Sequence, residues 1–288
     1  MSHLKTLLTG LVITLCLSPA AFAIPITIDL TSPDSREGIY NSTYAKQYNY
    51  EEDDLDLSLT GWSYGTKTET STTCTKYGKG KNKNTCIASK TTQTTSLDEA
   101  IEQEFVGKWD GLGIEKTDSP NHAVDNEAGD YDMHLLSFDE LVKLISLDIG
   151  WYKGDTDISI LAYRGNSFNS TTLLGKKWQE LIGNGWDLVG NYYNVDSGHN
   201  NGLVNLDGVT SKYWLVGSYN PNFGNTFSGP NKNVTKSEGK DYYKLKSATV
   251  ERELPDEPPV DVPEPNSLLL LALGLFGLGW ARRLRPTA

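Results

Sequence analysis

The sequence lacks the features of several common protein classes. It has three cysteines in 288 residues, and 26 Lys and Arg against 37 Asp and Glu give a formal charge of −11. A general nucleic-acid-binding protein needs a basic surface, so the acidic balance argues against a nucleic-acid partner. At 38% hydrophobic and 22% charged residues, the composition excludes wholesale disorder and a multi-spanning membrane protein.

Catalytic motifs are missing as well. The sequence contains neither Gly-x-Ser-x-Gly nor His-Glu-x-x-His, the signatures of a nucleophile elbow and of a zinc protease. His122 lies close to Asp125, but a hydrolase with this pair would also need an oriented nucleophile. We therefore predict no catalytic residue and no enzyme activity. A secreted glycan hydrolase remains an alternative, because the separation of its two carboxylates is spatial and leaves no sequence spacing.

The N-terminal residues 1–23 have the three parts of a secretory signal peptide. Lys5 precedes an apolar run over residues 7–17, and Ala21-Phe22-Ala23 forms a small-residue cleavage site. The apolar run is too short to span a bilayer. The sequence therefore predicts export and cleavage after Ala23.

The C-terminus contains a second short apolar run. An acidic, proline-rich linker over residues 254–262 precedes Pro263-Glu264-Pro265, an apolar run over 268–280, and the basic residues Arg282, Arg283 and Arg285. At about 1.5 Å per residue, a helix over this run is roughly 20 Å long, well short of the ~30 Å bilayer core. It would anchor the chain only weakly, with the arginines as a cytoplasmic membrane stop. A permanent single-pass anchor is the alternative.

Residues 263–288 resemble the PEP-CTERM sorting signal of Gram-negative bacteria, in which a Pro-Glu-Pro motif, a short apolar helix and an arginine cluster follow one another. The resemblance implies that an exosortase processes the chain at or near Pro263, Glu264 and Pro265. It also implies transient insertion in the inner membrane, with the domain periplasmic, before release to the cell surface or extracellular matrix. The apolar tail would then be absent from the mature protein, as in GPI-anchored proteins.

Removing both ends changes the charge and the cysteine count. The mature chain keeps 22 Lys and Arg against 37 Asp and Glu, a charge of −15, and retains Cys74 and Cys86. An even pair in an exported protein predicts a disulfide. Threonine-rich, β-favouring segments flank the pair, so we expect a hairpin linked by this disulfide near its turn. A zinc site or a redox pair is disfavoured by the wide spacing and the absence of a nearby histidine.

The loop between the two cysteines is basic within an acidic protein. It contains four lysines and no acid: Lys76, Lys79, Lys81 and Lys83. Such a run is usually a solvated hairpin tip, and the functional alternative is contact with an acidic polysaccharide.

Most of the remaining sequence predicts β-structure. Apolar and polar side chains alternate over 24–30 and 54–60. Further runs rich in β-branched or aromatic residues lie at 133–138, 142–151, 157–163, 186–195, 213–219 and 242–251. Gly- and Asn-rich turns separate these runs. We therefore expect a mainly β protein, a single antiparallel β-sandwich or jelly-roll-like domain over residues 24–253. Two short helices are expected, one behind a capping box at Ser96–Glu99 and one over 173–182.

Residues 109–159 contain a second resemblance. The segments WDGLGI at 109–114, SPNHAVDN at 119–126, IGW at 149–151 and DTDIS at 155–159 resemble a pattern shared by a group of exosortase-dependent surface proteins. The group has no established reaction, so the resemblance implies a location and a fold rather than a chemistry.

Two ligand hypotheses follow from the residue types. Calcium prefers oxygen ligands on loops, and the candidates are Asp125, Asn126, Asp130, Asp132, Asp155 and Asp157. They lack EF-hand spacing, and ordinary turn roles explain them equally well, so no cofactor is assigned. The tryptophans suggest a sugar-stacking platform, although core packing is the commoner role for those in or beside strands: Trp62, Trp109, Trp151, Trp186 and Trp214.

The sequence as a whole predicts a non-enzymatic exported surface or extracellular-matrix protein associated with exopolysaccharide or biofilm. A carbohydrate-binding module is the first alternative.

Overall fold

The computed structural model describes residues 24–115, 122–195, 202–228, 239–252, 273–276 and 280. The chain divides into two units, residues 1–253 and 254–288. Within the second unit, residues 273–276 and 280 are helical. No helix among the described residues is long and apolar enough to cross a membrane. The predicted signal peptide, the Pro263–Pro265 motif and the arginine cluster lie outside the described residues.

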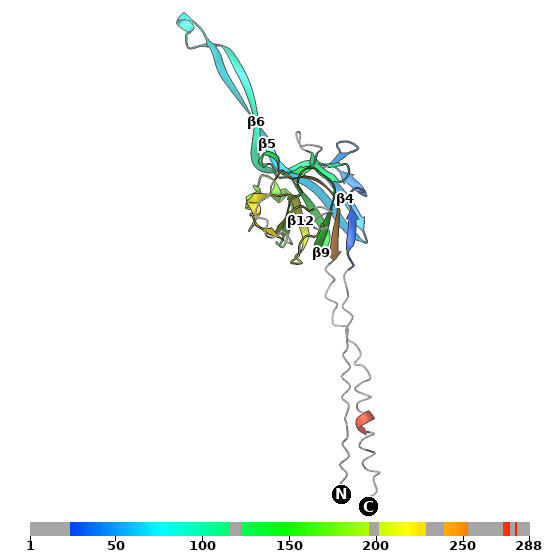
Figure 1. Cartoon of the computed structure of the whole chain (residues 1–288). Helices are drawn as coiled ribbons and strands as arrows, with labels where there is room; N and C mark the ends of the chain where they lie inside the picture. The colour runs from blue at the N-terminus through cyan, green and yellow to red at the C-terminus, as the bar shows by residue number, and fades with distance from the viewer. Residues whose placement is uncertain are drawn as a thin grey trace, which may run out of the picture. The chain divides into compact units, whose positions relative to one another are not determined.

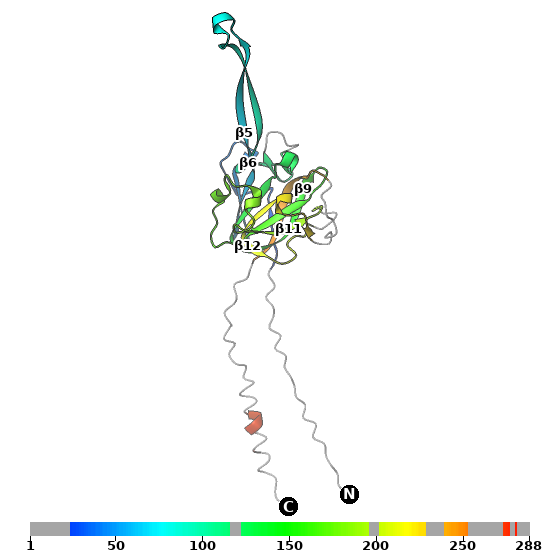
Figure 2. The same ribbon diagram turned by 90° about the vertical axis from the view of Figure 1, so that its left-hand side faces the viewer.

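The first unit is one hydrogen-bonded sheet of 14 strands, nearly all antiparallel (Figures 1 and 2). This confirms the expected mainly β class. The strands are β1 Ile26–Asp29, β2 Ser35–Glu37, β3 Tyr44–Ala45, β4 Gln47–Glu52, β5 Leu55–Tyr77, β6 Cys86–Lys108, β7 Leu112–Glu115, β8 Val124–Asp125, β9 Met133–Tyr152, β10 Ile158–Tyr163, β11 Trp186–Tyr192, β12 Thr210–Ser218, β13 Phe227–Ser228 and β14 Tyr242–Arg252.

The sheet closes on itself through β9. Residues 133–138 of this strand pair with β5, whereas residues 142–152 pair with β14. Because β14, β7, β6 and β5 are successive neighbours in the sheet, these four strands and β9 form a closed ring. The expected mainly β single domain is thus one curved sheet with barrel-like closure.

Two apolar clusters use opposite faces of the same strands. Leu136 belongs to the main core inside the curved sheet, and its neighbour Leu135 belongs to a second core on the outer face. This is the period-two alternation of a strand buried on both sides. Buried residues of three short 3-10 helices join the second core, namely those of η3 Ser170–Leu173, η4 Trp178–Glu180 and η5 Pro221–Phe223.

The prediction of a helix that begins at the capping box Ser96–Glu99 is wrong, because these residues lie in β6. The side chain of Asp98 accepts a hydrogen bond from the Ala100 backbone N–H at 2.9 Å, and Glu99 has a φ of 54°. The pairing of β6 with β5 shifts register at this level. The polar residues that resemble a capping box therefore form a β-bulge.

The helix expected over 173–182 is also wrong, since only the 3-10 turns η3 and η4 form there. Trp178 and Leu181 are buried there, whereas Ile182 is exposed.

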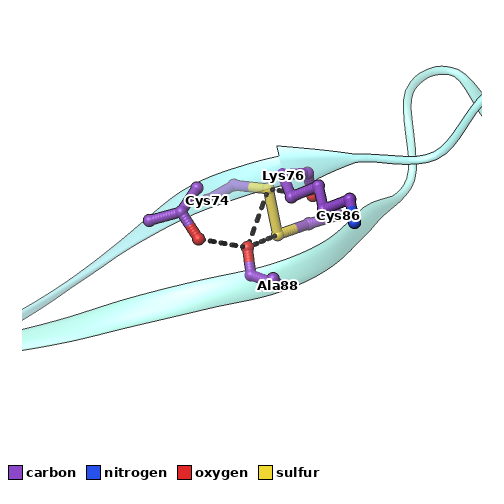
Figure 3. The surroundings of a disulfide bond; sticks show 5 residues. Cys74, Lys76, Cys86 and Ala88 are labelled. Atoms are coloured by element: carbon purple, nitrogen blue, oxygen red, sulfur yellow. Dashed lines mark hydrogen bonds between the residues drawn. A yellow bond between two sulfur atoms is a disulfide. The ribbon is translucent and has the colours of Figure 1, made fainter.

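The β5–β6 hairpin extends far beyond the rest of the sheet (Figure 1). From Thr66 to Ser96, which we call the arm, every residue is exposed except the half-buried Cys74 and Gly78. Cys74 and Cys86 form the predicted disulfide across the hairpin, with their Cα atoms 5.8 Å apart (Figure 3). The loop beyond it contains the 3-10 turn η1 Gly80–Asn82.

Candidate functional site

A pocket of about 420 Å³ lies where the ends of β6, β9 and β14 meet. Its walls are Trp109, Asp110, His122, Trp151 and Lys244. Three of the segments that resemble the surface-protein pattern, 109–114, 119–126 and 149–151, thus contribute to one site. Lys244 joins them from a distant part of the chain.

Strand pairing places Lys244 between two indole rings. Lys244 in β14 is the cross-strand partner of Trp151 in β9, so the two side chains lie on the same face of the sheet. Trp109 follows directly after β6. The Lys244 ammonium lies 5.1 Å from the ring centroid of Trp109 and 5.3 Å from that of Trp151, within the range of cation–π contacts.

Other aromatic rings fix the orientation of Trp109. The His122 ring packs against it with a centroid separation of 5.1 Å, and Tyr44 makes an edge contact at 5.2 Å. Trp109 nevertheless remains 40% exposed. The site therefore presents an indole that is both held in place and accessible to a ligand.

Glycines allow the backbones around the pocket to approach closely. A Cβ at Gly150 would lie 1.8 Å from the Asp110 carbonyl oxygen, and a Cβ at Gly113 would lie 1.7 Å from that of His122. No L-residue with a side chain fits at either position without a shift of the backbone. Gly113 and Gly150 therefore have a structural role, because the absence of a side chain lets the backbone of residues 122 and 110 pack against the sheet.

The electrostatics of the pocket centre on Lys244. Burial lowers the pKa of this lysine, and the nearby negative charge of Asp110 opposes that shift. No hydrogen bond or ion pair joins the Lys244 ammonium to any other residue that the structure describes. An ammonium flanked by indole faces can bind an anionic group while the rings stack on an apolar surface.

The tryptophans of the first unit divide into two groups. Trp62, Trp178, Trp186 and Trp214 are at most 2% exposed, which is the core role that the sequence favoured for Trp62, Trp186 and Trp214. Trp109 and Trp151 instead line the pocket. For this pair the expected core packing is wrong, and the stacking platform considered as the alternative describes them better.

A second cluster contains three carboxylates. Ligand oxygens of Asp155, Asp157 and Asp241 lie within 4.8 Å of one another, and Asp157 and Asp241 are fully buried. Burial raises the pKa of Asp241 to about 9, and the negative charge of Asp157 adds to this effect. Such a group can hold a proton or, with all three carboxylates ionised, a hard divalent cation such as calcium.

The structure separates the six predicted calcium ligands. Asp155 and Asp157 are in the carboxylate cluster, and Asn126 touches it by donating a hydrogen bond to the Asp241 carboxylate at 2.5 Å. Asp130 accepts a hydrogen bond from the Tyr64 backbone N–H at 2.9 Å, and Asp132 accepts one from the Asp125 N–H at 3.2 Å. The Asp125 carboxylate accepts a hydrogen bond from the Glu127 backbone N–H at 2.9 Å, which is a turn role, whereas Asp130 and Asp132 bind backbone groups farther along the chain. Calcium stays a prediction.

Sequence reasoning missed Asp241 and Lys244. Neither belongs to a local motif, and both meet their partners only because β14 pairs with β9 and β8. The four lysines of the arm were identified correctly as a hairpin tip, since Lys76, Lys79, Lys81 and Lys83 are all exposed there.

Comparison with known proteins identifies the C-terminus. The family model of the PEP-CTERM protein-sorting motif matches residues 261–283. No curated protein and no solved structure is significantly similar to the chain. The chain therefore carries the sorting motif of exported proteins that an exosortase processes for the surface or the extracellular space.

Proposed function

We propose that this exported protein is a component of the cell surface or extracellular matrix that binds an acidic exopolysaccharide of a biofilm in the pocket of Trp109, Trp151 and Lys244. The single observation that supports this most is the accessible pair of indoles in a molecule whose other described strand-associated tryptophans are buried. Indole rings stack on the apolar faces of sugars, and the contacts of Trp109 with Tyr44 and His122 fix its orientation before a ligand arrives.

Lys244 indicates the chemical class of the sugar. Its ammonium lies on the pocket wall between the two rings, where a uronic-acid carboxylate would meet it when the sugar ring stacks on Trp109 or Trp151. Pairing with such a carboxylate offsets the burial that lowers the lysine's pKa. A neutral sugar would leave this charge without a partner.

Binding without hydrolysis fits the residues that line the pocket. Asp110 is the one carboxylate among the described lining residues, whereas most glycoside hydrolases need two carboxylates flanking the bond that is cleaved. We therefore assign the pocket a binding role and no catalytic residue.

The sorting pathway completes the proposal. The signal peptide is cleaved after Ala23, the C-terminal apolar segment inserts transiently in the inner membrane of a Gram-negative cell, and Arg282, Arg283 and Arg285 stay cytoplasmic. An exosortase then cuts near Pro263–Pro265. The motif match over residues 261–283 supports this sequence of events.

Calorimetric titration of the exported protein with oligogalacturonate, and with a neutral oligosaccharide of equal length, tests the pocket. We expect Trp109→Ala and Trp151→Ala each to weaken oligogalacturonate binding by about tenfold, equivalent to about 1.4 kcal/mol. Lys244→Met should remove the preference for the charged ligand. Lys246→Met, an exposed lysine two residues along the same strand, is the matched control and should bind as the wild type does. If the wild type and all four variants bind oligogalacturonate with equal affinity, the pocket is not the binding site.

A further inference from the structure

The charge of the molecule is distributed very unevenly. The arm, residues 66–96, contains six lysines and one glutamate, whereas the rest of the mature chain has 16 Lys and Arg against 36 Asp and Glu. The arm therefore has a charge of +5 and the remainder −20. Four of the six lysines, those at positions 76, 79, 81 and 83, lie at the tip.

No strand outside the arm pairs with it in the part of the chain that the structure describes. Its two strands pair only with each other among the described residues, and threonines line it, with cross-strand hydroxyl contacts such as Thr68–Thr95 at 3.1 Å and Thr72–Thr91 at 3.2 Å. A two-stranded ribbon without a core is marginal by itself. The Cys74–Cys86 disulfide holds the strands together beside the tip, so the lysines are presented on a stiffened end.

An acidic groove lies at the other end of the same strand. It has a volume of about 480 Å³, and its lining includes the carboxylates of Glu37, Asp56 and Asp139 together with the half-buried Tyr213. No Lys or Arg is among its described lining residues. Exposed acids of the adjacent β4–β5 turn, residues 51–54, extend the negative surface. The groove thus combines an aromatic ring, on which a lysine stem can pack, with anionic groups for the ammonium heads.

Continuous strand geometry prevents the arm from reaching this groove in its own molecule. Asp56 lies at the start of β5, and Lys76 lies near its end. At about 3.3 Å per residue, the 20 residues between them separate the two sites by up to about 65 Å. Figures 1 and 2 both show the hairpin projecting away from the body of the sheet. A contact between tip and groove must therefore join two molecules.

We propose that the lysine tip of the arm docks in the Glu37–Asp56–Asp139 groove of a second copy of this chain. The surfaces that meet are different, so a single contact is heterologous: it leaves a free groove on one molecule and a free tip on the other. Repetition of such a contact generates an open head-to-tail chain rather than a closed dimer. The contact also brings a basic element between bodies that would otherwise repel each other. This inference is independent of the sugar pocket.

Analytical ultracentrifugation of the exported protein at several concentrations and salt levels tests the contact. At low ionic strength we expect a concentration-dependent series of species larger than the monomer. We expect these to dissociate in about 1 M NaCl, where the screening length falls to about 3 Å. The arm variant replaces each tip lysine by glutamate, and the groove variant carries Glu37→Lys, Asp56→Lys and Asp139→Lys. Each should be monomeric, with self-association weakened at least tenfold.

The decisive measurement is the protein that carries both sets of changes. Its reversed tip and reversed groove are complementary again, so it should recover self-association, whereas a loss of folding would not be rescued in this way. A charge-matched control reverses four exposed lysines of the body and should associate as the wild type does: Lys153, Lys176, Lys240 and Lys246.

Three results would overturn the proposal: a wild-type protein that stays monomeric at low salt, a combined variant that stays monomeric, or a control that loses association equally. An arm variant that loses only its binding to acidic polysaccharide, with no self-association in the wild type, would assign the tip to that polyanion instead. Trp109→Ala should leave self-association unchanged, which separates this test from that of the pocket.

Discussion

Replacement of His134 by leucine should remove much of the acid sensitivity of this protein. His134 lies in β9 and is fully buried. It is the cross-strand partner of Gly61 on one side and of Val216 on the other. Because strand side chains alternate, His134 faces the main core together with Leu136.

The magnitude follows from the two protonation equilibria. Burial lowers the pKa of His134 from 6.5 to about 3, and a backbone interaction with Gly113 acts weakly in the opposite direction. Between these two pH values the unfolded chain binds a proton that the folded chain does not. Stability is therefore lost as the pH falls through this window, by about 1.4 kcal/mol per pH unit. From pH 7.5 to pH 4.5 the loss due to this one residue is about 2.7 kcal/mol.

Urea unfolding of the wild type and of His134→Leu at pH 7.5 and pH 4.5 measures the effect. The carboxylates titrate in both proteins, so their contribution cancels in the difference between the two pH dependences. We expect the wild type to lose about 2.7 kcal/mol more than the variant on acidification. Packing of the leucine shifts the variant's stability equally at both pH values and does not affect this comparison.

An NMR titration of the imidazole gives an independent check. The His134 ring signals should stay at their neutral positions from pH 8 down to pH 4.5. The reasoning is refuted if the two proteins have the same pH dependence or if the ring protonates near pH 6.5.

Four further outcomes are expected. Replacing Cys74 and Cys86 by serine should speed proteolysis of the arm without lowering the unfolding midpoint of the body, because the disulfide lies within an exposed hairpin; limited proteolysis and calorimetry distinguish these effects. Calcium should raise the unfolding temperature, EGTA should reverse the rise, and Asp241→Asn should abolish it, since the cation would neutralise three clustered carboxylates. Gly150→Ala should destabilise the fold by about 1–3 kcal/mol in urea unfolding, because the new Cβ meets a carbonyl oxygen. Mass spectrometry of the exported protein should find it beginning after Ala23 and ending near the Pro-Glu-Pro motif; a chain that still ends at Ala288 would contradict the sorting pathway.

The features that the sequence determined are those set by local interactions. The sorting motif over residues 261–283 is a contiguous stretch of sequence. The Cys74–Cys86 bridge spans a short loop between two β-favouring segments, so its pairing could be inferred without the rest of the chain. Most strands were also predictable, because alternation of apolar and polar side chains depends only on neighbours in the sequence.

Predictions failed where a distant strand decided the local conformation. Residues 97–105 have helical spacing of Leu97, Ile101 and Phe105, yet pairing with β5 makes them a bulged strand. The hydrogen bonds and burial that β5 supplies exceed the small intrinsic preference for a helix. The same reason explains Trp109 and Trp151, because whether an indole is covered depends on the elements packed over it and not on its own strand.

The two candidate sites were decided only by tertiary structure. Lys244 reaches the indole pair, and Asp241 reaches Asp155 and Asp157, because β14 returns from the end of the domain to pair with β9. A sequence separation of about ninety residues carries no spacing signal, since a site is defined by distances between side chains. Local sequence thus determined where this protein is sent and which segments become strands, while the closure of the sheet determined which side chains meet.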